Sequence, residues 1–420
     1  MTAPRKSIFT TPIGRRTFGL AAAGAAAATV TPFNVLRAQG AALKIGVLLP
    51  RSGVQAQIGQ SCQRGVDIAA ALLSDLGYKA KVELISADTE TSVDVARSRA
   101  EKLIAEGAHA LVGAFDSGQT AAIAQVAEQK GVPFVINIAA APQITEQGYK
   151  FVFRNFPTSV HLVSQGLALC KDVFAATGKT PRTAVLMHIN DTFGQANKGA
   201  IDKLFPTLNM PFKLVDSIAY DPAAKDLSVE VAKAKATGAE LLMVVTRLND
   251  AILLVREMVK QRWEPMGIMS PGSPGMYQAP FYPALGKYAE FCISNVPWFN
   301  PKAELTQQTL RHFKRQFPND NPDFFLFDVG FTFEAIMTAV DAYTRAGSSK
   351  GAAMADALRK TRIAKRVMIG GPIEFDAKGQ NNSNRSACIQ NRNGRPTVVL
   401  PKEAAELAPV FPMPGWAQRA

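Results

Sequence analysis

The chain has 420 residues, of which 47% are hydrophobic and 19% are charged, and its formal net charge is +13. This length exceeds what one small hydrophobic core usually fills, so we expect two lobes. The composition is ordinary for a globular protein and excludes a disordered or collagen-like chain. The sequence has no block of lysine and arginine with interleaved aromatic residues, so nucleic acid is not an expected partner.

The segment 1–40 has the features of an export signal. An alanine-rich apolar run follows the pair Arg15-Arg16, which indicates a signal peptide of the twin-arginine type. A retained membrane anchor is the alternative, but the run is short and alanine-rich for a span. We expect cleavage between Ala38 and Ala42 and a mature protein in the periplasm. The five basic residues of this segment leave the rest of the chain with a net charge of +8, which suits an anionic ligand or an anionic membrane surface.

Strands and helices then alternate over 43–136 and again over 151–269. This alternation is typical of parallel sheets with helices on both faces and a ligand cleft at the carboxyl ends of the strands. The expected strands are 43–49, 81–86, 110–113, 133–136, 151–153, 183–187, 212–218, 241–245 and 266–269. The expected helices are 57–76, 92–106, 120–130, 160–176, 192–204, 227–236 and 251–260.

The last third of the chain has a different pattern. The expected elements are a strand over 289–296, long helices over 305–317 and 324–345, and short strands over 371–375, 386–390 and 397–400. They are too few for a third domain, so we expect them to complete the two lobes. The tail 403–420 is broken by Pro412 and Pro414, and we expect it to lie loosely on the surface.

The sequence contains no clear motif for catalysis or for a cofactor. Gly178-Lys179-Thr180 looks like the end of a phosphate-binding loop, but Val173 stands where that loop requires glycine. No GxGxxG follows the first strand, no GxSxG occurs, and the four histidines form no HExxH motif. We therefore expect no enzymatic activity, no metal site and no cofactor.

The four cysteines form no CxxC motif, so they do not indicate a metal or redox site. An exported protein can form disulfides. Because Cys292 and Cys388 both lie in strand-like runs, a disulfide between them is a hypothesis, and other pairings remain open.

Several motifs occur in an order and spacing that resemble one protein family. They are KIGVLLP followed by Ser52-Gly53, DTETS at 88–92, GAFDSGQT at 113–120, GVPF at 131–134, NDTFGQ at 190–195, and GPIEFD at 371–376 followed by Gly379. Together they resemble the Leu/Ile/Val-type substrate-binding proteins of ABC transporters, which take branched-chain amino acids or amides. The resemblance covers 43–400 and implies the type I periplasmic-binding fold: an α/β protein with two doubly wound parallel-sheet lobes joined by a three-crossover hinge.

The resemblance also implies how the chain is divided and what it works with. Lobe 1 would comprise 41–157 plus 298–371, lobe 2 would comprise 158–297 plus 372–402, and 403–420 would be the tail. The crossovers would fall near 157, 297 and 372. The lobes would close on a small ligand by hinge bending. The implied partners are an inner-membrane ABC permease and its ATPases, and we expect a monomer.

The resemblance places the ligand carboxylate at Ser117. A serine at a helix start offers a hydroxyl and free backbone amides to an anion, although a plain N-cap is the alternative. Ala139, Ala140 and Ala141 follow the next strand, where the family uses backbone groups and a hydroxyl that is missing here. Phe193 stands where the family usually has an aromatic residue at the mouth of the second lobe, and a core phenylalanine is the alternative.

Ile58 and Phe325 are expected on the pocket wall. Arg247 follows an expected strand, and it either clamps a carboxylate by a bidentate pair or is a solvated charge at the rim. Near Gly272, amino-acid-binding members of the family carry an acid that meets the ligand ammonium, but 270–278 contains no Asp or Glu.

A buried ammonium group without a countercharge is unfavourable. We therefore expect a carboxylate ligand without an α-amino group, either aromatic or branched. Amino acids, amides and urea are the alternative ligands. A sensory ligand-binding domain and an enzyme on the same scaffold are the alternative functions.

Overall fold

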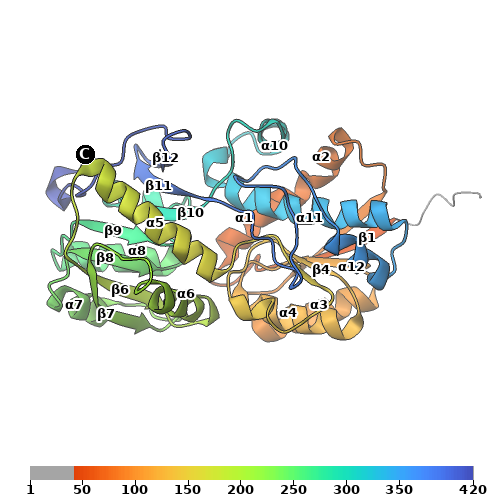
Figure 1. Ribbon diagram of the computed structural model, residues 1–420, viewed down its shortest axis with the longest axis horizontal. Helices are drawn as coiled ribbons and strands as arrows, with labels where there is room; N and C mark the ends of the chain where they lie inside the picture. Colours follow the sequence, from red (N-terminus) through yellow and green to blue (C-terminus); the bar gives the residue numbers. More distant parts are fainter. Residues whose placement is uncertain (1–41, 420) are drawn as a thin grey trace, which may run out of the picture. The chain divides into compact units, whose positions relative to one another are not determined.

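The computed structural model describes residues 42–419, and the first of its two sheets is parallel throughout (Figure 1). The expected signal peptide, 1–40, lies outside the described residues. The strand order is β2-β1-β3-β4-β5. The strands are β1 (Leu43–Leu49), β2 (Val82–Asp88), β3 (Ala110–Gly113), β4 (Phe134–Ile136) and β5 (Val152–Arg154).

Helices cover both faces of the first sheet, because successive side chains of its strands point to opposite sides. Ile45 and Val47 of β1 face one core, whereas Leu48 faces the other. The first core contains α1 (Ala56–Asp67), α2 (Ala69–Asp75), α10 (Glu304–Gln316), α11 (Leu326–Ala346) and α12 (Gly351–Arg359), and the second contains α3 (Val93–Ala105) and α4 (Ser117–Lys130). Helix α1 lies so close to α11 that a Cβ atom on Gly65 would be 2.7 Å from the Val329 carbonyl oxygen.

The second sheet has the order β12-β11-β10-β9-β8-β6-β7. Its strands are β6 (Thr183–Ile189), β7 (Lys213–Tyr220), β8 (Leu241–Val245), β9 (Gly267–Ser270), β10 (Ile293–Pro297), β11 (Ser386–Arg392) and β12 (Arg395–Leu400). Strand β11 runs antiparallel to both of its neighbours, and the other pairs are parallel.

Helices also pack on both faces of this second sheet. One face carries α5 (Ser159–Thr177) and α6 (Thr192–Leu204), and the other carries α7 (Ser228–Ala236), α8 (Leu248–Lys260) and α9 (Phe281–Leu285). The expected α/β fold with two doubly wound lobes is confirmed. Within residues 42–419, no helix is both long enough and apolar enough to cross a bilayer.

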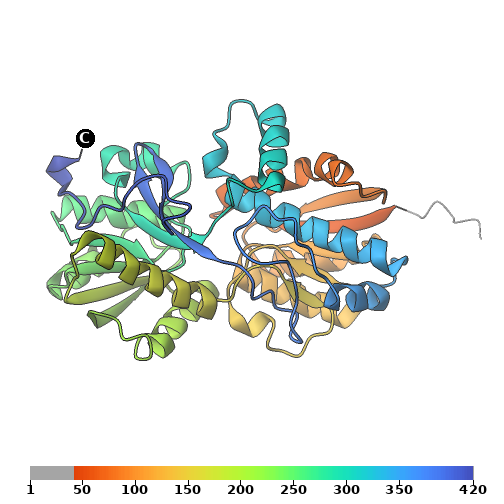
Figure 2. The ribbon, with the colours of Figure 1, turned by 45° about the horizontal axis from the view of Figure 1, so that its top comes forward.

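The chain passes between the lobes after β5, after β10 and before β11 (Figure 2). The third crossing differs from the expected one near 372. The Gly379 carbonyl oxygen accepts a hydrogen bond from Arg154 N at 2.7 Å, and Asn381 N donates to the Arg154 carbonyl oxygen at 2.9 Å. The stretch before Ser386 therefore still lies along the first sheet, and the chain joins the second sheet only at β11.

The third crossing comes later than expected because the backbone at Gly379 lies close to the backbone of β5. A Cβ atom on Gly379 would lie 2.3 Å from the Val152 carbonyl oxygen, so the glycine lets this segment reach the edge of the first sheet. The strand expected over 371–375 is reduced to one bridge, between Ile363 and Ile373.

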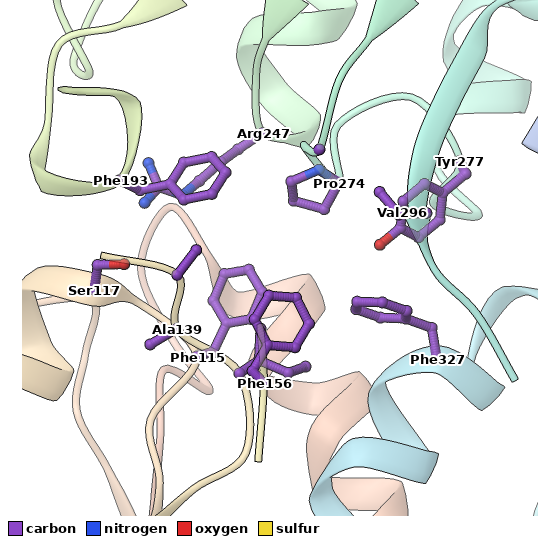
Figure 3. Close-up of a pocket in the computed structure, with 13 residues that line it drawn as sticks. Phe115, Ser117, Ala139, Phe156, Phe193, Arg247, Pro274, Tyr277, Val296 and Phe327 are labelled. Atoms are coloured by element: carbon purple, nitrogen blue, oxygen red, sulfur yellow. The ribbon is translucent and has the colours of Figure 1, made fainter. Parts of the chain in front are cut away.

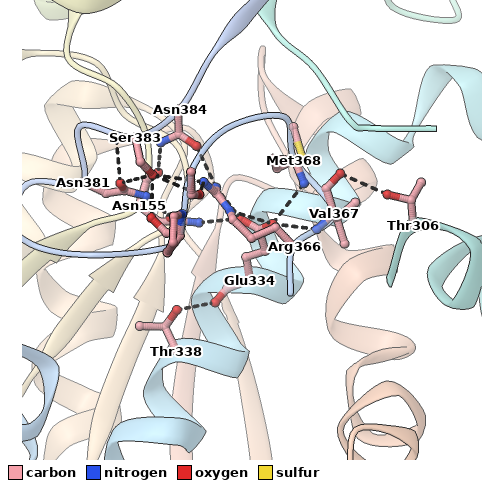
Figure 4. Close-up of polar contacts among 12 residues, drawn as sticks. Asn155, Thr306, Glu334, Thr338, Arg366, Val367, Met368, Asn381, Ser383 and Asn384 are labelled. Atoms are coloured by element: carbon pink, nitrogen blue, oxygen red, sulfur yellow. Dashed lines mark hydrogen bonds and ion pairs between the residues drawn. The ribbon is translucent and has the colours of Figure 1, made fainter. Parts of the chain in front are cut away.

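A buried polar network ties two of the crossing segments to α11 (Figure 4). Glu334 of α11 is fully buried, and its carboxylate pairs with Arg366 at 2.8 Å. The same carboxylate accepts a hydrogen bond from Asn155 Nδ2 at 3.0 Å. Asn384 Nδ2 in turn donates to the Asn155 carbonyl oxygen at 2.6 Å. These hydrogen bonds therefore hold the segments after β5 and before β11 against α11 in the first lobe.

From Phe411 onward the C-terminal tail packs firmly on the second lobe, so the expectation of a loose tail is wrong for this part. Phe411, Met413 and Trp416 are all buried in the cores of that lobe. Met413 N donates to the Met266 carbonyl oxygen at 2.8 Å, and Trp416 Nε1 donates to the Trp263 carbonyl oxygen at 3.0 Å. The prolines exclude regular helix, but the apolar residues between them still gain free energy by burial.

All four cysteines are buried and unpaired in the described part of the chain. The hypothesis of a Cys292–Cys388 disulfide is wrong. In the ladder between β10 and β11, Cys388 lies opposite Asn295. Cys292 lies three residues before Asn295, opposite Asn391. Because side chains alternate along a strand, the two sulfurs face opposite cores of the lobe.

Candidate functional site

A cavity lies between the lobes at the carboxyl ends of strands from both sheets (Figure 3). The space between its lining atoms, including the part open to solvent, is about 420 Å³. The lining residues are Phe115, Ser117, Ile138, Ala139, Ala140, Phe156, Phe193, Arg247, Gly272, Pro274, Tyr277, Val296 and Phe327.

Ser117 forms the polar end of the cavity. Helix α4 begins at Ser117, but its N-cap is Asp116, whose Oδ1 accepts a hydrogen bond from Gln119 N at 3.0 Å. Ser117 Oγ instead accepts from Ala141 N at 3.3 Å, and its own proton has no acceptor among the described residues. The plain N-cap alternative is therefore wrong, and the hydroxyl is free to donate into the cavity.

The loop after β4 adds backbone donors beside this hydroxyl. Ala139 and Ala140 line the cavity, and their amide N–H groups find no acceptor within residues 42–419. Such unpaired amides need a partner when they are buried. Together with Ser117 at the first turn of α4, they form a group of donors that suits an oxygen anion.

Arg154, which sequence reasoning missed, holds this loop in place. The guanidinium is fully buried and forms no ion pair with any described residue. Its Nη1 donates to the carbonyl oxygens of Ala139 at 3.1 Å and Ala141 at 2.7 Å, while Nη2 donates to Thr145 Oγ1 at 2.7 Å. Burial lowers the pKa of Arg154 to about 9, so the group stays charged at neutral pH behind the donors that face the cavity.

Arg247 connects the two lobes across the cavity rim. Its Nη2 pairs with Asp116 of the first lobe at 2.8 Å, and its Nη1 pairs with Asp191 of the second. Burial lowers the pKa of Arg247, but the attraction of Asp116 and Asp191 outweighs this effect and holds the pKa above its ordinary value. Because the side chain is buried and doubly paired, the solvated-rim alternative is wrong. Two protein carboxylates already occupy the donors that were expected to clamp a ligand.

The walls of the cavity are mainly aromatic. Phe156 and Phe327 meet edge to face with ring centroids 6.1 Å apart, and Tyr277 meets Phe327 in the same way at 5.7 Å. Phe193 lies on the second-lobe side, with its ring centroid 5.2 Å from the Arg247 guanidinium. No described lining residue is Asp or Glu. The cavity is therefore apolar except for the donors at one end, the doubly paired Arg247 and the tyrosine hydroxyl.

The structure brings together six of the residues expected at the site. These are Ser117, Ala139, Ala140, Phe193, Arg247 and Gly272. Ala141 lies directly behind them, where its amide donates to Ser117 Oγ.

Two expected wall residues do not line the cavity. Ile58 is buried in the core under α1. Phe325 stacks on Phe313 with ring centroids 5.7 Å apart, and the Arg64 guanidinium covers it 4.2 Å from the ring centroid. Phe325 precedes the first turn of α11, and Phe327, two residues later, points into the cavity instead.

Two α/β lobes that share a small, partly apolar cavity at their strand ends define a two-lobed binding protein of the solute-binding class. The chain belongs to the periplasmic binding protein family, whose family model matches residues 42–395. The resemblance to Leu/Ile/Val-type binding proteins is confirmed. The chain is 25% identical over 268 residues to the Leu/Ile/Val-binding protein homolog 8 of Brucella abortus (strain 2308), and this match spans 63% of this chain and 66% of that protein.

Solved structures share the fold at lower sequence identity. The leucine-binding protein LivK from Thermotoga maritima aligns with a TM-score of 0.72 and 22% identity, over 85% of this chain and 97% of that chain. A solute-binding protein of an ABC transporter from R. palustris, solved in complex with benzoate, aligns with a TM-score of 0.72 and 19% identity, over 87% of this chain and 99% of that chain.

Proposed function

We propose that this protein binds a small carboxylic acid without an α-amino group, preferably an aromatic acid, and delivers it to an ABC importer. The observation that carries this proposal is the cavity itself. Hydrogen-bond donors cluster at one end, aromatic rings form the walls, and no described lining residue is acidic.

The donor end suits a carboxylate. Ser117 offers a hydroxyl proton, and Ala139 and Ala140 offer unpaired amides. Hydrogen bonds from such donors to an ionised oxygen are stronger than those to a neutral one. The buried charge of Arg154, which lies against the carbonyl side of the same loop, further favours an anion over a neutral group.

The cavity is poorly suited to an ammonium group. Asp116 and Asp191 flank the rim, and both already pair with Arg247. A ligand ammonium would lose its water without gaining a countercharge, which is unfavourable in an apolar site. This argues against leucine-like amino acids, although the Thermotoga neighbour is a leucine-binding protein.

The aromatic walls favour a flat ligand. Phe115, Phe156, Phe193 and Phe327 present ring faces and edges to one small space, and aromatic pairs gain free energy beyond their buried area. The benzoate complex of the R. palustris neighbour shows that a protein of this fold accepts an aromatic acid.

We further propose that the twin-arginine signal exports the protein to the periplasm, where it acts as a monomer with a membrane permease and its ATPases. The paired arginines at 15–16 and the family membership of residues 42–395 support this view.

Calorimetry on the mature protein tests the ligand class. Benzoate should bind, short branched acids should bind more weakly, and leucine should not bind at micromolar concentrations. Ser117→Ala should weaken benzoate binding about tenfold, because a hydrogen bond to a charged group contributes about 1.5 kcal/mol or more. Ser228→Ala is the matched control, since Ser228 also opens a helix but lies outside the cavity. Micromolar leucine binding, or no effect of Ser117→Ala on benzoate, would refute the proposal.

A further inference from the structure

We infer that Tyr277 is a specificity residue whose hydroxyl receives a second polar group of the ligand, at the end opposite the carboxylate. The inference rests on the proposed function of the cavity and narrows its ligand class. The preferred ligand would be a flat carboxylic acid with a hydrogen-bonding substituent on its far side, such as a ring hydroxyl.

Packing fixes the position of Tyr277. The residue follows β9 in the second lobe and is only 2% exposed. Its ring meets Trp298 edge to face at 5.3 Å between centroids and meets Phe327 at 5.7 Å. These contacts leave the ring little freedom, so its hydroxyl is held in one place.

The hydroxyl points into the cavity from the side opposite Ser117. Figure 3 shows the Tyr277 oxygen directed toward the space between Pro274 and Phe327, with Ser117 at the other end of the lining. A ligand whose carboxylate meets Ser117 would therefore extend its far end toward Tyr277.

This oxygen has no hydrogen-bond partner among the described residues. A buried tyrosine hydroxyl usually finds one. Of the other polar side chains that line the cavity, Ser117 accepts a hydrogen bond from Ala141 N and has its proton left for the carboxylate, and Arg247 forms two ion pairs. A phenylalanine would fill the same space between Trp298 and Phe327 without leaving a polar atom unpaired, so packing alone does not account for a tyrosine here.

The hydroxyl is suited to a neutral polar group. Burial, reinforced by the nearby Asp328 and Cys62, raises the pKa of Tyr277 well above its ordinary value. The phenol therefore stays protonated, and it can both donate and accept a hydrogen bond. A ring hydroxyl, carbonyl or amide of the ligand would satisfy it, whereas an unsubstituted ring would leave it unpaired.

Calorimetry with benzoate, 3-hydroxybenzoate and 4-hydroxybenzoate tests the inference. The wild-type protein should bind one of the two hydroxybenzoates about tenfold more tightly than benzoate. Tyr277→Phe should abolish this preference, so that the affinities of the two hydroxybenzoates and of benzoate for the variant agree within about threefold. Tyr282→Phe is the control, because Tyr282 is also a buried tyrosine of the second lobe, but its hydroxyl donates to Asn391 Oδ1 at 2.7 Å, away from the cavity.

The possible outcomes separate the two proposals. If the wild type binds benzoate and both hydroxybenzoates equally, or if Tyr277→Phe keeps the preference, the role of Tyr277 is refuted while the carboxylate site stands. If none of these acids binds but leucine does, the proposed ligand class itself fails, and the inference about Tyr277 fails with it.

Discussion

Asp328 makes the stability of the first lobe depend on pH in a direction opposite to most carboxylates. This residue follows Phe327 on α11 and is 5% exposed. Burial raises its pKa to about 7 from 3.8, against the smaller opposing effects of Ser61 and Arg64. Between pH 3.8 and about pH 7, Asp328 keeps its proton in the folded protein but has lost it in the unfolded chain. The free energy of unfolding therefore falls as the pH rises through this window.

The magnitude follows from the two pKa values. With a folded pKa of about 7 and an unfolded pKa of 3.8, the contribution of Asp328 becomes less favourable by about 3 kcal/mol from pH 5 to pH 8. Asp328→Asn keeps the shape of the side chain but cannot ionise. The stability of this variant relative to wild type should therefore improve by about 3 kcal/mol over the same interval.

Urea denaturation of the ligand-free mature protein at the two pH values, followed by tryptophan fluorescence, measures this difference. Asp67→Asn is the control, because Asp67 is an exposed carboxylate on the neighbouring helix α1, and its effect should stay within about 0.5 kcal/mol at both pH values. A constant difference between Asp328→Asn and wild type would show that Asp328 ionises in the folded protein as it does in the unfolded chain, and the reasoning would be refuted.

Substitutions at three further residues test other features. Arg154→Gln should weaken benzoate binding at least about tenfold, because the loop that carries Ala139 would lose its hydrogen bonds to the guanidinium. Arg154→Lys should restore only part of the affinity. Unchanged benzoate affinity in both variants would contradict the positioning role of Arg154. Arg247→Gln removes the ion pairs with Asp116 and Asp191, so it should weaken benzoate binding by about 2 kcal/mol. It should also raise the radius of gyration of the ligand-free protein in small-angle scattering. An unaltered scattering curve would argue against an ion-pair bridge between the lobes. Trp416→Ala should lower the free energy of unfolding by about 3 kcal/mol without changing ligand affinity, and an unaffected melting temperature would indicate a loose tail.

The alternation of strands and helices was predictable because each element buries a periodic face. Short apolar runs such as Leu241–Val245 form buried parallel strands, and the stretches between them have helical periodicity. The tail was predicted wrongly, because prolines mark the end of regular structure but do not prevent Phe411 and Trp416 from packing. The path of 372–382 was also missed, since isolated bridges beside β5 leave no periodic pattern in the sequence.

The candidate site was predictable in part. Ser117 follows a buried strand and opens a helix, which is a position that sequence reasoning can recognise. Phe325 was predicted at the wall, but α11 begins only at Leu326, and Phe327 lines the cavity instead, because residues two apart on a helix face different sides. Arg154 lacked any sequence signal, because its role depends on carbonyl groups brought to it by the fold.

The unpaired cysteines bear on whether it is better for this chain to fold before or after translocation. An unfolded chain that reached an oxidising compartment would expose all of its thiols to disulfide exchange, and any pair formed there would be foreign to the native structure. Burial raises the pKa of the Cys170 and Cys292 thiols to about 12, so the reactive thiolate is scarce once the protein has folded. Folding in a reducing compartment before translocation would protect every sulfur before it meets an oxidant.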